Sequence, residues 1–232
     1  MSFVSFFRRF TGREQQLRFS QFAYRHGLVV NTPMRIARND EVIGAEYIRS
    51  SSLELVAREI NERGVAGAVA ELGVYQGEFA ALINVAFPDR RLYLFDTFAG
   101  FDKDQVTEDL SRNRIPDALN DFSQTSVELV MARMKFKHNC VAMPGLFPDS
   151  AVSCPETQYA FVSIDCDLYQ PIYDGLSYFY PRLSSGGYIF MHDYNNPQYL
   201  GPREALKRFA SELPISYFPL TDASGSAVIY KP

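Results

Sequence analysis

The chain has 232 residues, of which 47% are hydrophobic and 22% are charged, and its formal net charge at pH 7 is −4. This length and apolar content allow a substantial core in one large domain. The acidic balance excludes a surface that coats nucleic acid, because phosphate binding depends on clustered Lys and Arg. A small molecule is therefore the expected partner.

The cysteines and the hydropathy indicate the compartment. Cys140, Cys154 and Cys166 have neither a paired nor a metal-type spacing, which is typical of a reducing cytoplasm. No apolar run reaches the roughly 20 residues that span a bilayer, and the N-terminus lacks the pattern of a signal peptide. We therefore expect a cytoplasmic protein without a transmembrane segment.

Residues 1–45 are expected to form a helical N-terminal extension, and residues 46–232 the main domain. The extension begins with aromatic side chains around two arginines, a composition that can form a short basic amphipathic helix. Such a helix can touch a membrane surface, or it can pack on its own domain or on a second subunit as a lid or dimer contact. Packing is favoured because a short helix binds lipid weakly, so we expect a homodimer.

From residue 46 onward, periodicity predicts alternating helices and strands. Helices are expected over residues 46–63, 78–87, 125–134, 172–183 and 203–213. Strands are expected over residues 68–72, 91–95, 140–143, 159–164, 188–191, 215–220 and 226–230. This order predicts an α/β fold with a mostly parallel seven-stranded sheet, helices on both faces and an antiparallel last strand.

Residues 99–123 interrupt this alternation. They are rich in Asp, Asn, Ser and Arg, with Pro116 among them. We expect an insertion over the edge of the sheet, and such a segment can act as a lid.

The strand at 68–72 leads through Gly73 and Gly77 into a helix. Glycine is needed in such a turn where a ligand lies close to the backbone, although glycines also let a strand pack on the next helix. Asp96 ends the next strand about 20 residues later, where a carboxylate can accept hydrogen bonds from both hydroxyls of a ribose. The loop lacks the tight pyrophosphate pattern, and Glu71 and Glu78 flank it, which disfavours a phosphate. An amino group and a sulfonium suit these acids, and this points to S-adenosylmethionine.

Two later strands also end at polar residues. Asp165 follows the strand at 159–164, and His192 and Asp193 follow the strand at 188–191. Because the carboxyl ends of parallel strands share one edge of a sheet, these side chains are expected where a substrate or a metal meets the cofactor.

Five motifs carry a family resemblance. In chain order they are ELGVYQGEF at 71–79, LYLFDTFAGF at 92–101, PGLFPD at 144–149, SIDCDLYQP at 163–171 and GYIFMHDYN at 187–195. They resemble the macrocin-type sugar O-methyltransferases, and the similarity runs from about residue 32 onward. The resemblance implies a class I methyltransferase (Rossmann-like) fold, S-adenosylmethionine as methyl donor, a sugar or glycosylated small molecule as acceptor, and a divalent metal, usually Mg²⁺, that holds a substrate diol.

The resemblance also assigns residues by position. The implied cofactor-binding residues are Glu71, Gly73, Val74, Tyr75, Gly77, Asp96, Thr97, Phe98, Gly145, Leu146, Phe147 and Asp165. Among them, Gly73 and Gly77 are expected near the methionine part, Asp96 near the ribose, and residues 145–147 near the adenine. The metal positions fall on Asp165, His192 and Asp193. His192 departs from the family, whose members usually carry an acid there, and a hard cation such as Mg²⁺ prefers oxygen ligands.

Two arrangements can activate the acceptor hydroxyl. In one, Asp165, His192 and Asp193 are the catalytic group through a metal that lowers the pKa of a bound hydroxyl. In the other there is no metal, and His192 is the general base, oriented by Asp165 or Asp193. The lysine base of catechol-type relatives is excluded, because its position holds Leu168. Asp167 can line the acceptor site or cap the next helix.

Two other classes of function are considered. A non-catalytic binding or assembly protein would keep the fold but needs no clustered polar groups, which are costly to bury. An NAD-linked oxidoreductase fits the sheet but lacks the pyrophosphate fingerprint.

Overall fold

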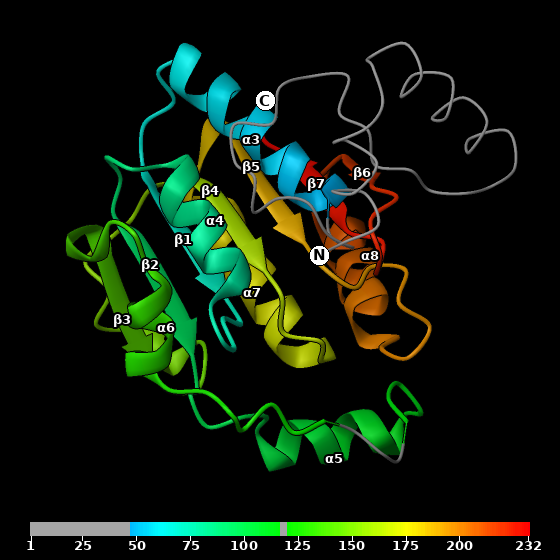
Figure 1. Ribbon diagram of the computed structural model, residues 1–232. Coiled ribbons are helices and arrows are strands. Elements are labelled where there is room, and N and C mark those ends of the chain that lie inside the picture. Colours follow the sequence, from blue (N-terminus) through cyan, green and yellow to red (C-terminus); the bar gives the residue numbers. More distant parts are fainter. Residues whose placement is uncertain (1–46, 117–119) are drawn as a thin grey trace, which may run out of the picture. The chain divides into compact units, whose positions relative to one another are not determined.

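The computed structural model describes residues 47–116 and 120–232 (Figure 1). The predicted extension at 1–45, with its membrane, lid or dimer contact, lies outside the described residues, and so do residues 117–119 of the insertion. Within the described ranges, no helix has the length and apolar character that crossing a membrane requires.

The described residues form a seven-stranded sheet. In chain order its strands are β1 (Ala68–Leu72), β2 (Leu92–Asp96), β3 (Cys140–Pro144), β4 (Tyr159–Ile164), β5 (Leu183–Met191), β6 (Tyr217–Pro219) and β7 (Ala227–Tyr230). Their order in space is β3-β2-β1-β4-β5-β7-β6. The pairs from β3 to β5 are parallel, while β7 runs antiparallel to both of its neighbours. The predicted mostly parallel sheet with an antiparallel last strand is confirmed.

Helices alternate with these strands. They are α3 (Tyr47–Glu62), α4 (Glu78–Ala86), α5 (Lys103–Ser111), α6 (Val127–Arg133), α7 (Tyr169–Arg182) and α8 (Gly201–Glu212), together with the short 3₁₀ helices η2 (Lys137–Asn139) and η3 (Asp149–Ala151). Helix α6 begins two residues after the expected start at residue 125, because the Ser126 hydroxyl caps it by accepting a hydrogen bond from the Leu129 amide.

Helices cover both faces of the sheet (Figure 1). Buried apolar side chains form two layers between these helices and the sheet, one on each face. Leu176 of α7 and Leu206 of α8 belong to one layer, and Ile60 of α3, Ile83 of α4 and Val130 of α6 belong to the other. β1 and β4 are buried along their whole length, as strands at the centre of a doubly covered sheet are. Polar side chains can therefore meet ligands only where these strands end.

The two largest differences from the predicted boundaries are at the starts of β5 and α7. β5 begins at Leu183 and not at the expected Tyr188, because the Ser-Ser-Gly-Gly stretch at 184–187 belongs to the strand. The preceding helix α7 begins at Tyr169, three residues before the expected start at Ile172. Both shifts leave the strand ends unchanged, so the expected positions of the polar residues hold.

The insertion at 99–123 contains a helix, α5, that the polar sequence did not indicate. Asp102 caps this helix by accepting hydrogen bonds from the Asp104 and Gln105 amides. The insertion also has a small apolar cluster of its own, which comprises Phe101, Val106, Leu110, Ile115, Leu168 and Tyr199. It is thus packed against the segments after β4 and β5.

Candidate active site

Backbone hydrogen bonds align the five strand ends that carry the predicted residues. The Asp165 amide donates to the Leu72 carbonyl at 2.8 Å, and the His192 amide donates to the Ile164 carbonyl at 2.9 Å. The ends of β1, β4 and β5 thus lie side by side. On the other flank, the Gly145 amide donates to the Asp96 carbonyl at 3.0 Å and aligns β3 with β2.

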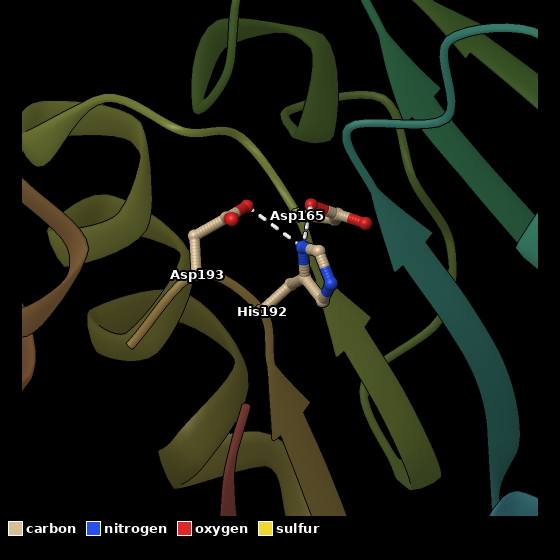
Figure 2. A group of neighbouring side chains, drawn as sticks. All are labelled: Asp165, His192 and Asp193. Atoms are coloured by element: carbon tan, nitrogen blue, oxygen red, sulfur yellow. Dashed lines mark hydrogen bonds and ion pairs between the residues drawn. The ribbon is translucent and has the colours of Figure 1, made fainter. Parts of the chain in front are cut away.

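The three predicted catalytic side chains lie together, with the carboxylates of Asp165 and Asp193 both facing one ring nitrogen of His192. His192 Nδ1 lies 3.0 Å from Asp165 Oδ1 and 2.7 Å from Asp193 Oδ2. Figure 2 shows the imidazole turned so that this nitrogen faces both carboxylates. One ligand atom from each of the three residues lies within 4.8 Å of the others, a spacing that could hold a metal ion.

The charges of this group are strongly coupled. Burial disfavours a charged imidazole, but the carboxylate of Asp165 and the hydrogen bonds to both acids outweigh it and raise the pKa of His192 to about 12. Burial likewise opposes ionisation of Asp165, yet the charges of His192 and Arg49 hold its pKa well below the usual range. Both shifts favour an imidazolium ion of His192 paired with the carboxylate of Asp165.

The pKa of Asp167 shifts in the opposite direction from that of Asp165. Burial first, and then the negative charges of Asp193 and Asp165, raise the pKa of its carboxyl well above the ordinary value. Asp167 and Asp193 both have positive φ angles, 59° and 57°, which are unusual for residues other than glycine. Strained backbone of this kind concentrates at functional sites.

Arg49 of α3 is a site residue that the sequence analysis missed. Its side chain is buried and donates from Nη1 to Asp165 Oδ2 at 2.9 Å and from Nη2 to the Ser163 hydroxyl at 3.0 Å. Its guanidinium lies over the Phe79 ring at 3.8 Å. Nothing local marks an arginine in a helix as buried, because its partner is 116 positions away in the chain.

Glu71 is also fully buried within this group. Burial raises the pKa of its carboxyl well above the usual value, although Arg49 opposes the shift. Its Oε2 atom has no hydrogen-bond partner among the described residues. The sequence argument treated Glu71 as a full negative charge, whereas its surroundings favour the neutral acid.

The glycines of the loop after β1 are required by packing. At Gly73, φ is +82° and a Cβ atom would lie 2.0 Å from the Asp165 carbonyl oxygen. At Gly77, a Cβ atom would lie 3.0 Å from the Val130 side chain. The packing role considered for these glycines is therefore present, and Gly73 lets the loop touch the turn that carries Asp165.

Asp96 anchors the same loop. Its Oδ2 accepts hydrogen bonds from the Val74 and Tyr75 amides at 2.6 and 2.9 Å, and its Oδ1 accepts from the Phe98 amide at 2.7 Å. Thr97 lies beside it, with its hydroxyl donating to the Gly100 carbonyl. The carboxylate expected at a ribose thus also fixes the shape of the loop.

The predicted adenine segment divides into buried and exposed residues. Phe147 is buried, with its ring 5.7 Å from those of Phe95 and Phe179, so it belongs to the core. Leu146 is 40% exposed, and Gly145 has φ +126° with no atom closer than 3.5 Å to a Cβ placed there. Of the three residues, only these two have surface to offer a ligand.

Two solved methyltransferases share this architecture. The structure of the O-methyltransferase NovP matches with a TM-score of 0.63, 22% identity, and coverage of 79% of this chain and 80% of that one. The calicheamicin methyltransferase CalS11 matches with a TM-score of 0.59, 20% identity, and coverage of 95% and 93%. The class I methyltransferase fold is therefore shown.

Sequence relatives narrow the class to a family. Residues 7–231 match the family model described as Macrocin-O-methyltransferase (TylF). The chain is 30% identical over 182 residues to mycinamicin III 3''-O-methyltransferase of Micromonospora griseorubida, which covers 72% of this chain and 70% of that protein. It is 26% identical over 199 residues to 8-demethyl-8-(2,3-dimethoxy-alpha-L-rhamnosyl)-tetracenomycin-C 4'-O-methyltransferase of Streptomyces olivaceus, with coverage of 79% and 72%.

The chain belongs to the macrocin O-methyltransferase family of S-adenosylmethionine-dependent enzymes. The resemblance in the five motifs is confirmed. Membership favours methyl transfer over both other classes considered, the NAD-linked oxidoreductase and the non-catalytic binding protein.

Proposed function

We propose that this protein transfers the methyl group of S-adenosylmethionine to a hydroxyl group of a sugar or of a glycosylated small molecule. The observation that carries the proposal is the direct contact between the loop after β1 and the turn of Asp165, beside His192 and Asp193. Two relatives support a sugar acceptor, since their names specify methylation at a 3'' position and on a rhamnosyl compound.

The loops after β1, β2 and β3 supply the cofactor site in this proposal. Glu71 and Gly73 lie toward the methionine part, and Asp96 toward the ribose through the remaining lone pair of its Oδ1. Gly145 and Leu146 lie toward the adenine, for which Leu146 offers exposed apolar surface. Phe147 supports this segment from the core.

Asp165, His192 and Asp193 fit a divalent cation in the spacing of their donor atoms. Arg49 occupies Oδ2 of Asp165, which leaves Oδ1 facing His192 and the site. One nitrogen and two oxygen donors suit a borderline cation such as Fe²⁺, Co²⁺ or Zn²⁺ better than Mg²⁺. Bound there, the cation would lower the pKa of a coordinated hydroxyl and orient a diol.

Methyl transfer requires the acceptor oxygen to attack the methyl carbon in line while the bond from sulfur to that carbon breaks. The hydroxyl proton must leave, and His192 already holds a proton at neutral pH because its pKa is near 12. The Asp167 carboxyl, whose pKa burial and the charge of Asp193 raise, lies beside the same group and is a second candidate for the general base.

Calorimetry tests the cofactor assignment. S-adenosylmethionine and S-adenosylhomocysteine are expected to bind the wild-type protein, and Asp96→Ala is expected to weaken both about 100-fold, because it removes the ribose contact and the anchor of the loop. Leu55→Ala, at an exposed position on α3, is the control and leaves affinity unchanged. No heat with either ligand would contradict the proposal.

Proton release tests the metal assignment. A cation that takes Nδ1 of His192 displaces its proton, so titration with Co²⁺ or Zn²⁺ in buffers of different ionisation enthalpy should show about one proton released per ion. His192→Asp makes the donor set all oxygen; it should abolish this release and shift preference toward Mg²⁺. Methyl transfer that survives EDTA unchanged but is lost in His192→Ala would instead support the metal-free histidine base.

The acceptor requires a direct search. Mass spectrometry after incubation with methyl-labelled S-adenosylmethionine and a panel of sugar nucleotides and glycosylated compounds should show one labelled product.

The expected location of the protein is the cytoplasm, which the free state of Cys140, Cys154 and Cys166 supports.

A further inference from the structure

Asp109 of α5 is a buried carboxylate in a segment that the sequence marks as a polar insertion. Its side chain is 2% exposed. Asp109 Oδ2 accepts a hydrogen bond from the Tyr169 amide at 2.9 Å, and its Oδ1 accepts from Arg114 Nη1 at 3.1 Å. Tyr169 is the first residue of α7, and Leu168 before it provides no side-chain cap. Asp109 therefore caps α7 from 60 positions away.

Arg114 connects Asp109 and the start of α7 to α8. Its Nε donates to Glu204 Oε2 at 2.7 Å, and its guanidinium lies over the Tyr169 ring at 3.8 Å. The Leu200 amide donates to the Arg114 carbonyl at 2.8 Å. At Gly201, a Cβ atom would lie 2.7 Å from the Tyr169 nitrogen, so α7 and α8 begin in direct contact. One ion pair thus joins the insertion to the starts of both helices.

Both helix starts adjoin the active site. The turn from Asp165 to Leu168 ends at the amide that Asp109 holds, and Leu168 is 1% exposed within the apolar cluster of the insertion. Tyr199 belongs to the same cluster. Burial and the charges of Asp167 and Asp193 raise the pKa of Tyr199 to about 12, so those carboxylates lie within electrostatic range.

Stability alone does not account for such a pair. Burying an ion pair costs desolvation that its attraction does not reliably recover, and an apolar replacement of similar volume is often neutral. The geometry of this pair is specific, because each carboxylate oxygen serves a different partner.

We propose that Asp109 and Arg114 are positioning residues that fix the turn from Asp165 to Leu168 for the reaction by tying the insertion to the start of α7. In this arrangement the insertion is fixed in place beside the turn that carries Asp165. The effect on catalysis rests on the proposed methyl transfer, whereas the effect on the turn does not.

Asp109→Asn and Arg114→Met test the proposal, and Arg114→Lys tests whether charge alone suffices. Asn retains the shape of Asp, and Lys retains the charge of Arg without its planar fork. The matched control is Arg112→Met, which removes the exposed ion pair of Arg112 with Glu108 on the same insertion. Calorimetry with S-adenosylhomocysteine confirms that each variant is folded and still binds this ligand.

Two readouts need no acceptor. Hydrogen exchange of the Tyr169 amide should accelerate about tenfold or more in Asp109→Asn, and exchange of the amides at 165–168 should accelerate with it. The imidazole N–H proton signal of His192, assigned among three histidines by comparison with His192→Ala, should shift in Asp109→Asn and Arg114→Met but not in Arg112→Met.

The kinetic readout separates positioning from folding. With the acceptor found in the labelled-methyl search, kcat should fall about 10- to 100-fold in Asp109→Asn, and Arg114→Lys should be intermediate. Faster exchange confined to Tyr169, with the His192 signal and the amides at 165–168 unchanged, would overturn the proposal even if no acceptor were found. Altered exchange and His192 signals without any methyl transfer would instead overturn the proposed function.

Discussion

Single residues in the site are arranged as alternating charges. Arg49 and His192 are the cations, and Asp165 lies between them with one oxygen toward each. Asp193 faces the imidazole from the other side. The consequence is that Asp165 stays ionised and fixed in orientation even though it lies in a largely buried cluster.

Arg49→Met is expected to reduce kcat about 10- to 100-fold, because Asp165 loses the donor that fixes its orientation, while cofactor affinity changes little. The loss of buried hydrogen bonds should also lower the free energy of unfolding by about 2 kcal/mol. Arg90→Met is a matched control, since Arg90 donates to the Gly67 carbonyl before β1 and lies near the Phe87 ring. Urea unfolding measures the stability of both variants, and a methyl-transfer assay measures their activity. The same fractional loss of activity in both variants would contradict the prediction.

The raised pKa of His192 predicts a pH dependence of stability. Its folded-state pKa of about 12 exceeds the unfolded value near 6.5, so the folded protein binds the extra proton. This contribution is fully present below pH 6.5 and is lost progressively as the pH rises toward 12. Between pH 7 and 9, the wild-type protein should lose more stability than His192→Gln, as measured by urea unfolding.

His138→Gln is the control for this comparison, because His138 is exposed in η2. It should follow the wild-type profile. Parallel pH profiles for wild type and His192→Gln would show that the imidazole is not held as a cation.

At the scale of elements, the loop after β1 and the turn after β4 behave as one unit. Gly73 places its backbone against the Asp165 carbonyl, and Asp96 holds the amides of the same loop. A change in the cofactor loop therefore moves the carboxylate that faces the acceptor.

Gly73→Ala tests this contact. A Cβ atom there would lie 2.0 Å from the Asp165 carbonyl oxygen, so the strand ends must separate. We expect a loss of at least about 3 kcal/mol in unfolding free energy and no measurable activity. Gly64→Ala is the control, because Gly64 has φ +64° but no neighbouring atom within 4 Å, and it should cost only about 1 kcal/mol.

If thermal unfolding showed equal losses of stability for the two alanine variants, backbone strain alone would explain the effect of Gly73→Ala. The close approach of the two strand ends would then have no separate effect on stability.

Across the whole molecule, the aromatic core reaches the candidate cofactor site. Phe147 packs on Phe95, Phe179 and Tyr178, while its neighbour Leu146 is partly exposed. Phe147→Ala should lower the free energy of unfolding by about 3–5 kcal/mol. Leu146→Ala should change stability by less than about 1 kcal/mol but weaken S-adenosylmethionine binding.

Urea unfolding combined with calorimetry separates these two effects. A large loss of stability in Leu146→Ala, or an unchanged cofactor affinity, would contradict the assignment of Leu146 to the ligand surface.

The sequence predicted the parts of this molecule that depend on local pattern. The strand at 159–164 and the end of β5 before His192 follow from buried apolar runs. Helix α5 was missed because its Lys103–Ser111 segment is polar and stabilised by the Asp102 cap. Arg49 and Asp109 were missed because each acts through a partner far away in the chain, which periodicity and spacing do not reveal.

The antiparallel position of β7 has a consequence for folding during synthesis. β5, which carries His192 at its end, pairs with β4 on one side and with β7 on the other. Residues 227–230 leave the ribosome after every other strand of the sheet, so until then β5 has an open edge available to other chains. Nascent chains that stall before residue 227 should therefore be prone to aggregate. β5 gains its second partner strand only after β7 has been synthesised.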